Sequence, residues 1–359
     1  MIFHYPLPLN PNATAASGIR PLRMIDAFKE IGYHVTIIDG YGADRKDKIA
    51  SLKQQILSGV KFDFLYSESS TQPTLLTEKN HLPKYPLLDF AFMNFCKIHN
   101  IKIGLFYRDI YWLFPEYGKD LSFIKKYLAK LFYKYDLIKY NSLVDSIYLP
   151  SIHMSKYIHT IPVSKFKTLP PGHNIYNSLP EINNQKDTIN LLYIGGLGSH
   201  YQMHKLFKAL KNFKQINFTL CTRKKEWENI KDEYKLLNNI NIVHKSGKEL
   251  NELYQKTDIA ILFVKPQEYR EFAAPVKLFE YIGQEKPIIA SKGTLAGEFV
   301  EKNDIGWNID YTEVALKTLL TQLINNKDLI LMKKKNIKAI KANHTWKARA
   351  RKVQEDLIS

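Results

Sequence analysis

The sequence predicts an α/β protein with two successive domains, each built around a parallel sheet. Its 359 residues exceed what one ordinary core holds. Strand candidates alternate with helix candidates along the chain, which is typical of parallel sheets covered by helices on both faces. The pattern stops at a turn rich in proline and glycine and then restarts, and this restart predicts the second domain.

The first half opens on an apolar segment, residues 1–4, and then alternates. Residues 19–31 are expected to form a helix, because apolar residues recur every three positions, Pro21 lies in the first turn and Gly32 follows the end. The other elements are expected as strands at 34–39, 62–66, 101–107 and 146–149, and as helices near 45–58, 86–99 and 121–140.

The domain boundary is expected at Leu169-Pro170-Pro171-Gly172, which a polar stretch follows. After it come strand candidates at 191–194, 217–221, 240–243, 259–263 and 287–290, separated by helical segments. The sequence therefore predicts Rossmann-like domains at 1–172 and 173–340. Ligands of such sheets bind at the carboxyl ends of the strands, and a cleft between two such domains is the expected site.

Composition narrows the class of protein. Apolar residues make up 45% of the chain and charged residues 24%, as in globular proteins. The two cysteines cannot build a disulfide framework, the first residues lack a signal-peptide pattern, and no apolar run approaches ~18 residues. We therefore expect a cytoplasmic protein. Neither His-x-Glu nor Cys-x-x-Cys spacing occurs, so no metal site is expected.

The chain is basic, with a net charge of +17 from 52 Lys and Arg against 35 Asp and Glu. A basic protein attracts anionic partners: nucleic acid, an anionic membrane, or phosphate-bearing substrates. The lysines are spread along the chain and form no recognised nucleic-acid-binding module. A nucleic-acid-binding protein is therefore the less favoured interpretation, and no nucleic acid is expected as partner.

Two segments of the second half have the residue types that bind a nucleotide. In residues 191–198 a strand runs into Gly195, Gly196 and Gly198, where the backbone can approach a phosphate closely. In residues 271–291, Lys277 and Glu280 are three apart and share one face of a helix that starts near Pro275. A carboxylate there can accept ribose hydroxyls, and the lysine can face phosphate. A solvated Lys–Glu pair on the helix is the alternative interpretation.

The run from Pro275 to Ser291, Pro-Val-Lys-Leu-Phe-Glu-Tyr-Ile-Gly followed by Lys-Pro-Ile-Ile-Ala-Ser, resembles the donor-binding signature of GT-B glycosyltransferases. It is most similar to the large retaining family known as glycosyl transferases group 1, or family 4. Residues 191–196 resemble that family's glycine loop, and residues 242–247 the segment around the nucleobase. The helix in residues 341–359 resembles the piece that crosses back onto the first domain.

The resemblance implies roles for individual residues. Glu280 binds the ribose hydroxyls, Gly195 and Gly196 approach the diphosphate, and Ser246 lies in the nucleobase segment. The backbone of Ala274, Pro275 and Val276 meets the sugar or phosphate. Glu271 stands one residue before the position of the family's second, sugar-contacting glutamate, which is Phe272 here.

A leaving diphosphate needs a cation, and Gly196 stands where the family usually has an arginine. Arg223 and Lys224 follow the strand that ends at Cys221, at the sheet edge that should face the same site. We expect Arg223 to be the main cation and Lys277 the second. A solvated loop at 223–225 is the alternative interpretation.

The first half offers acceptor-side candidates. Arg108 and Asp109 follow the strand at 101–107, where Asp109 can act as a general base or orient the acceptor and Arg108 can hold it. An Arg–Asp structural pair explains the same residues equally well. Gly18, at the end of the loop 8–20, is a candidate for the donor diphosphate, and the loop 68–73 is a candidate for the acceptor.

The helix at 121–140 is amphipathic and basic. One face collects six apolar or aromatic residues, Ile124, Tyr127, Leu128, Leu131, Tyr135 and Ile138, and the other collects Lys126, Lys130 and Lys134. This pattern fits a helix resting on an anionic membrane. It fits equally a helix whose apolar face is buried in the core. The first interpretation places the protein on the inner face of the cell membrane.

Together these patterns predict a metal-independent enzyme without a cofactor. It transfers a sugar from a nucleoside-diphosphate sugar, with UDP favoured, to a hydroxyl of a glycan or lipid-linked acceptor in bacterial surface polysaccharide synthesis. The resemblance implies retention of the anomeric configuration. The alternatives are a nucleotide-sugar epimerase on the same fold and the basic nucleic-acid-binding protein.

Overall fold

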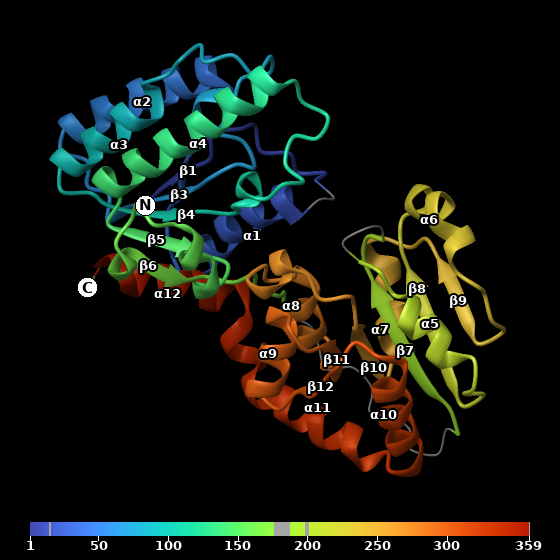
Figure 1. Ribbon diagram of the computed structural model, residues 1–359. Helices are drawn as coiled ribbons and strands as arrows, with labels where there is room; N and C mark the ends of the chain where they lie inside the picture. Colours follow the sequence, from blue (N-terminus) through green and yellow to red (C-terminus); the bar gives the residue numbers. More distant parts are fainter. Residues whose placement is uncertain (14–15, 176–186, 198–200, 359) are drawn as a thin grey trace. The chain divides into compact units, whose positions relative to one another are not determined.

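The protein divides into two compact units in the computed structural model, which describes residues 1–13, 16–175, 187–197 and 201–358 (Figure 1). The first unit comprises Met1–Pro171 and Trp346–Ser359, and the second comprises Gly172–Thr345. Each unit contains one six-stranded sheet, and every described strand pair is parallel. The predicted α/β class with two Rossmann-like domains is confirmed.

The first sheet has the order β2-β1-β3-β4-β5-β6. Its strands are β1 (Ile2–His4), β2 (Thr36–Ile38), β3 (Phe64–Glu68), β4 (Lys102–Phe106), β5 (Ser146–Leu149) and β6 (Phe166–Thr168). All five residues of β3 are buried, as expected for a central strand with helices on both faces. The short strand β6 at the edge is absent from the prediction.

Helices cover both faces of this sheet (Figure 1). They are α1 (Ala16–Glu30), α2 (Gly42–Leu57), α3 (Leu88–Ile98), α4 (Phe123–Leu143) and α12 (Trp346–Ile358). Helix α12 packs beside α1 and against β4, where a Cβ on Gly104 would lie 2.9 Å from a methyl carbon of Leu357. Glycine at position 104 therefore allows the last helix to approach the sheet.

Helix α1 begins at Ala16, three residues before the predicted start, and it contains Pro21. A proline has no N–H to donate to the carbonyl four residues earlier, here that of Ser17. Because Pro21 lies near the N-terminus of the helix, only this one hydrogen bond is lost. The helix can therefore begin five residues before the proline, at Ala16.

The second sheet has the order β12-β11-β10-β7-β8-β9. Its strands are β7 (Ile189–Ile194), β8 (Ile216–Cys221), β9 (Ile240–Val243), β10 (Ile259–Leu262), β11 (Ile288–Ser291) and β12 (Gly306–Ile309). Its helices are α5 (His204–Leu210), α6 (Lys224–Ile230), α7 (Leu250–Lys256), α8 (Val276–Gly283), α9 (Leu295–Lys302), α10 (Glu313–Asn325) and α11 (Asp328–Ile340). The strands β7 and β10 are central, so the glycines after β7 leave the middle of the sheet.

The chain passes from the first unit to the second at Pro171–Gly172 and returns at Thr345–Trp346. Within the second unit the two crossings are adjacent, because the backbone N–H of His173 donates to the carbonyl of His344 at 3.0 Å. No helix in the described part of the chain is both long and apolar enough to span a membrane.

Candidate functional site

The carboxyl edge of the second sheet brings together the glycines and the expected cation. Ile194 and Cys221, the last residues of β7 and β8, are paired in register, and the N–H of Gly195 donates to the carbonyl of Cys221 at 3.0 Å. Gly195 and Arg223 therefore leave the sheet side by side at the edge where ligands of such folds bind.

Tyr193 forms a hydrogen bond to the glycine loop that follows its own strand. Its hydroxyl donates to the carbonyl of Gly196 at 2.8 Å, and burial raises the pKa of this phenol well above its usual value, so it stays a donor. A Cβ on Gly195 would lie 2.7 Å from the Tyr193 oxygen, so position 195 accepts only glycine without rearrangement. Sequence reasoning assigned no role to Tyr193. Gly198 lies outside the described residues.

A helix follows the glycines after an interval that includes residues 198–200, which lie outside the described part of the chain. Helix α5 starts at His204. The N–H groups of α5 are therefore separated in sequence from Gly195 and Gly196, and the backbone of the loop itself is what can approach a ligand.

Helix α8 presents the Lys277–Glu280 pair. Pro275 is its N-cap residue, and the Nζ of Lys277 lies 3.2 Å from an Oε of Glu280. Their side chains are 29% and 31% exposed, whereas the apolar residues around them, Leu278, Phe279, Tyr281 and Ile282, are buried. The polar pair therefore lies on the one side of α8 that remains accessible.

Tyr281 fixes α8 against the end of β7. Its hydroxyl accepts a hydrogen bond from the backbone N–H of Ile194 at 2.9 Å, and burial raises the pKa of this phenol. Ile194 immediately precedes Gly195, and Tyr281 immediately follows Glu280. The bond therefore ties the helix that carries Glu280 to the strand end that carries the glycines.

A carboxylate occupies the glycine loop. Glu226 on α6 accepts hydrogen bonds from the N–H of Leu197 at 3.2 Å and from the hydroxyl of Thr222 at 3.4 Å. Its other oxygen lies 2.6 Å from Nη1 of Arg223, whose side chain is 74% exposed. Glu226 was not predicted as a site residue, because its contact with Leu197 spans 29 positions. Lys224, the first residue of α6, is exposed.

The remaining candidates of this unit lie farther along the same edge or in the loop before α8. Ser246 follows the edge strand β9 and is exposed, and its N–H donates to Glu249 at 3.4 Å. Glu271 is exposed at the end of a short 3-10 helix, Glu268–Glu271, while Phe272 is buried. Ala274 and Val276 flank Pro275 and are half-buried.

A small pocket that the prediction missed opens beside the start of α8. Its lining includes Tyr201, Leu262, Arg270, Pro275 and Thr294. The Arg270 guanidinium lies 3.8 Å from the centre of the Tyr201 ring, and Arg270 is buried. Arg270 is thus a further cation near Pro275, supplied by the short 3-10 helix Glu268–Glu271 that follows β10.

The acceptor-side candidates lie in the first unit, at the carboxyl edge of its sheet. Arg108 donates to the fully buried Glu68 at 3.0 Å and to the carbonyl of Ser69 at 3.2 Å. Asp109 accepts from the N–H of Tyr111 at 2.9 Å, which fixes the short 3-10 helix Tyr111–Leu113. The structure therefore assigns Arg108 an ion pair with Glu68, the first residue of the predicted acceptor loop.

Gly18 lies in the first turn of α1. A Cβ at this position would be 2.7 Å from the Cβ of Ala13, so glycine is needed for the loop to fold back on the helix. The described residues contain no group of three His, Cys, Asp or Glu side chains that could hold a metal ion. Metal independence stays a prediction.

The family model for glycosyl transferases group 1 matches residues 177–352. A curated relative from Pelagibacter ubique, UDP-N-acetylglucosamine–N-acetylmuramyl-(pentapeptide) pyrophosphoryl-undecaprenol N-acetylglucosamine transferase, is 27% identical over 262 residues. The match covers 70% of this chain and 66% of that protein's length.

Several solved structures share the fold along the whole chain. Anabaena HepE in complex with UDP superposes with a TM-score of 0.67 at 15% identity and 99% coverage of both chains. A glycosyltransferase from Rickettsia africae gives 0.64 at 16% identity, covering 99% of this chain and 97% of that one. WaaG, a glycosyltransferase involved in lipopolysaccharide biosynthesis, gives 0.59 at 13% identity and 99% coverage of both chains. At these identities the likeness shows the fold alone.

Proposed function

We propose that this chain transfers a sugar from a nucleoside-diphosphate sugar to a hydroxyl group, because it has the GT-B fold and its residues 177–352 match the family model for glycosyl transferases group 1. We propose UDP as the nucleotide, because UDP is bound in the HepE structure. For the acceptor we propose a glycan or lipid-linked sugar of a bacterial surface polysaccharide. The Pelagibacter relative, whose name gives an undecaprenol-linked acceptor, supports this choice.

The observation that carries the proposal is the bond from Ile194 to Tyr281, which joins the helix that carries Glu280 to the strand end that precedes Gly195. A carboxylate that accepts two ribose hydroxyls and a loop that approaches a diphosphate must lie a few ångströms apart to bind one nucleotide. The carboxylate of Glu280 is accessible enough to exchange Lys277 for a ribose. We therefore assign the ribose to Glu280 and the diphosphate to the backbone around Gly195 and Gly196.

Cleavage of the donor leaves a nucleoside diphosphate, and its developing negative charge needs cations. We propose that Arg223 and Lys277 supply them, with no metal ion and with retention at the anomeric carbon. Both cations are paired with glutamates through three-residue spacings on the protein surface. Such pairs contribute little to stability, so a phosphate can replace either glutamate at small cost.

In the first unit we propose Asp109 as the carboxylate that orients the acceptor hydroxyl or removes its proton. Arg108 then acts as a positioning residue, because its guanidinium joins the strand end to Glu68 and to the Ser69 carbonyl. We further propose that the enzyme works on the cytoplasmic side of the membrane that carries its acceptor.

The test is binding and turnover of UDP-, GDP- and ADP-sugars by the full chain and by Glu280→Ala. We expect a UDP-sugar to bind and to be hydrolysed slowly without acceptor. Loss of two hydrogen bonds at about 1 kcal/mol each predicts roughly 30-fold weaker donor binding by Glu280→Ala.

Glu228→Ala is the matched control. Glu228 pairs with Lys231 at 2.7 Å through the same three-residue spacing in the same unit, and it is exposed. This variant should bind donor as the unmodified protein does. The absence of both turnover and binding with every nucleotide sugar would overturn the proposed function. Normal donor binding by Glu280→Ala would overturn the site assignment.

A further inference from the structure

One side of helix α4 is packed against the core of the first unit. Ala129, Tyr133, Leu137 and Tyr140 are buried. Tyr133 stacks on Trp112 with ring centres 5.0 Å apart, and Tyr140 packs against Phe90 of α3 at 5.9 Å. Figure 1 shows α4 lying beside α3 on one face of the first sheet. The opposite side of α4 therefore points away from the core of its unit.

That outer side is apolar along the first three turns. We call it the α4 apolar surface. It consists of Leu121, which precedes the helix, and of Phe123, Ile124, Tyr127, Leu128 and Leu131, all of them exposed. Phe123 is 83% exposed and Ile124 is 70% exposed. The apolar face recognised in the sequence thus points outward at its N-terminal end. Exposed apolar side chains gathered in this way mark an interaction site.

Lysines surround the α4 apolar surface. Residues 121–135 contain Lys125, Lys126, Lys130 and Lys134 and no acidic residue. None of these four forms an ion pair with another residue of the described chain. Their charge is therefore uncompensated within the described first unit and is available to an anionic partner.

We propose that the α4 apolar surface rests on an anionic lipid bilayer, with its apolar side chains among the acyl chains near the headgroups and its lysines at the lipid phosphates. Lysines snorkel from an apolar strip to the polar boundary in this way. The contact follows from α4 itself, and only the idea that the acceptor lies in the same membrane rests on the proposed function.

Two other occupants fit the side chains less well. In a symmetric dimer across this surface the four lysines of one copy would face the same four of the other, at an electrostatic cost. Nucleic acid would pair with the lysines, but six apolar side chains offer nothing to a phosphate backbone. An anionic bilayer satisfies both halves of the surface at once.

The experiment is flotation of the full-length protein with vesicles, in parallel with donor binding in solution. Vesicles of phosphatidylcholine alone are compared with vesicles that also contain phosphatidylglycerol. We expect binding to the anionic vesicles, falling with salt, and weak binding to the neutral ones.

Two pairs of variants divide the surface. Phe123→Ser with Ile124→Ser should weaken vesicle binding at least about tenfold, because two apolar side chains leave the bilayer. The matched control is Leu57→Ser with Ile98→Ser, at two residues of the same unit that are each 68% exposed.

Lys125→Gln with Lys130→Gln should weaken binding about 25-fold, at roughly fivefold per lysine. The control for charge is Lys46→Gln with Lys61→Gln, at exposed positions outside α4.

The controls should bind vesicles normally, and all variants should bind UDP-sugar normally. Equal vesicle binding by the α4 variants and their controls would overturn the proposal, as would the absence of binding to anionic vesicles. So would a dimer, seen by sedimentation, that dissociates when Phe123 and Ile124 are replaced. If vesicle binding holds and no nucleotide binds, the proposed function fails and the membrane contact stands.

Discussion

The carboxyl edges of the two sheets both carry arginine or lysine paired with glutamate, but the pairs are buried at the first edge and partly exposed at the second. In the first unit Glu68 is fully buried between Arg20 and Arg108, at 3.2 and 3.0 Å. In the second unit the pairs at positions 223 and 226 and at 277 and 280 join residues one turn apart, and each side chain is at least 26% exposed. The ion pairs of the first edge are fixed by burial, whereas those of the second edge are accessible enough to exchange one partner for a ligand.

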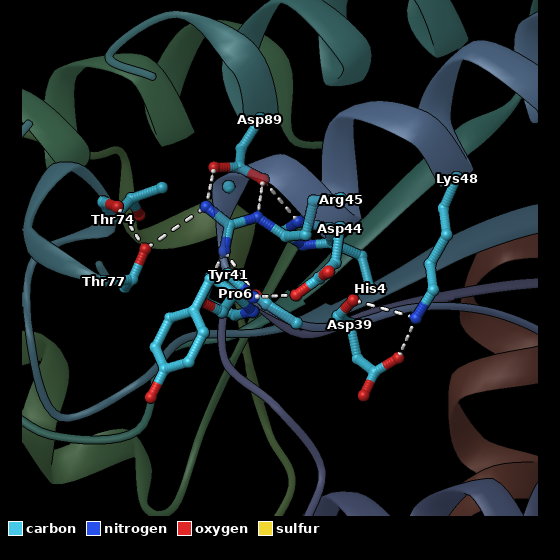
Figure 2. A network of polar contacts seen from close by, with 12 residues as sticks. His4, Pro6, Asp39, Tyr41, Asp44, Arg45, Lys48, Thr74, Thr77 and Asp89 are labelled. Carbon is cyan, nitrogen blue, oxygen red and sulfur yellow. Dashed lines mark hydrogen bonds and ion pairs between the residues drawn. The ribbon is translucent and has the colours of Figure 1, made fainter. Parts of the chain in front are cut away.

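A second buried network extends the contrast (Figure 2). Asp89 accepts two hydrogen bonds from Arg45, at 2.9 and 3.0 Å, and one from His4 at 2.9 Å. Burial alone would raise the pKa of Asp89, but His4 and Arg45 lower it. Arg45 also donates to the carbonyls of Pro6 and Gly40. This network joins β1, α2 and α3 through buried side chains.

Burial explains why the two edges differ. A buried ion pair that loses one partner leaves an uncompensated charge, whereas an exposed pair that opens is solvated by water. A ligand can therefore displace a glutamate of the second edge but not of the first. Polar residues at a strand end indicate binding only when they remain accessible.

The largest expected effect comes from breaking the first edge. Glu68→Ala leaves Arg20 and Arg108 without their carboxylate and should lower the free energy of unfolding by about 3–5 kcal/mol. Glu226→Ala removes a half-buried carboxylate whose partner Arg223 is exposed, and it should cost less than about 1 kcal/mol. Urea denaturation of both variants checks the difference. Equal losses would mean that the two edges do not differ in the way described.

The next effect concerns a buried carboxylate without a counter-charge. Asp136 accepts from the N–H of Thr74 at 2.7 Å, while its other oxygen has no hydrogen-bond partner among the residues that the structure describes. Burial raises the pKa of Asp136 to about 7, against the opposing hydrogen bonds from Thr74. The folded state then holds a proton between about pH 4 and pH 7 that the unfolded chain has released, so stability falls as the pH rises through this range.

Asp136→Asn removes that proton-linked cost. We expect the variant to be more stable than the unmodified protein at pH 8, by about 2–4 kcal/mol, and the gain to shrink towards pH 4. Unfolding measured across this range checks the slope. A pH-independent difference between the two proteins would show that Asp136 does not titrate in the folded state near neutral pH.

The smallest expected effect tests exchange at the second edge. A donor diphosphate competes with Glu226 for the N–H of Leu197 and for Arg223. Glu226→Gln weakens this internal competitor by removing its charge, so UDP should bind about three- to tenfold more tightly. Titration calorimetry measures it, with Glu228→Gln as control. Weaker binding by Glu226→Gln would assign Glu226 a direct role in holding the donor.

Local patterns could be predicted from the sequence. The strands at 146–149 and 240–243 have the predicted bounds, because turn residues delimit short runs of apolar and β-branched residues. The shared face of Lys277 and Glu280 follows from helical spacing alone. The fold class followed from the alternation of such elements.

Contacts between distant positions could not be predicted. Arg108 reaches Glu68 across 40 positions, and Glu226 reaches Leu197 across 29. Both depend on which strands become neighbours. The periodicity of α4 identified its apolar face. The face that is buried is a different one, where Tyr133 packs on Trp112 and Tyr140 packs on Phe90. Exposure, the property that separates the two edges, belongs to the tertiary structure.

The return of α12 to the first unit has a consequence for how this protein is made. Trp346, Ala350, Val353 and Leu357 belong to the same buried cluster as Phe3, Phe28 and Tyr66. During translation the ribosome completes both sheets before these four side chains emerge. The growing chain therefore carries an incomplete N-terminal core until residues 346–357 have left the ribosome, and apolar surface exposed in this interval favours aggregation.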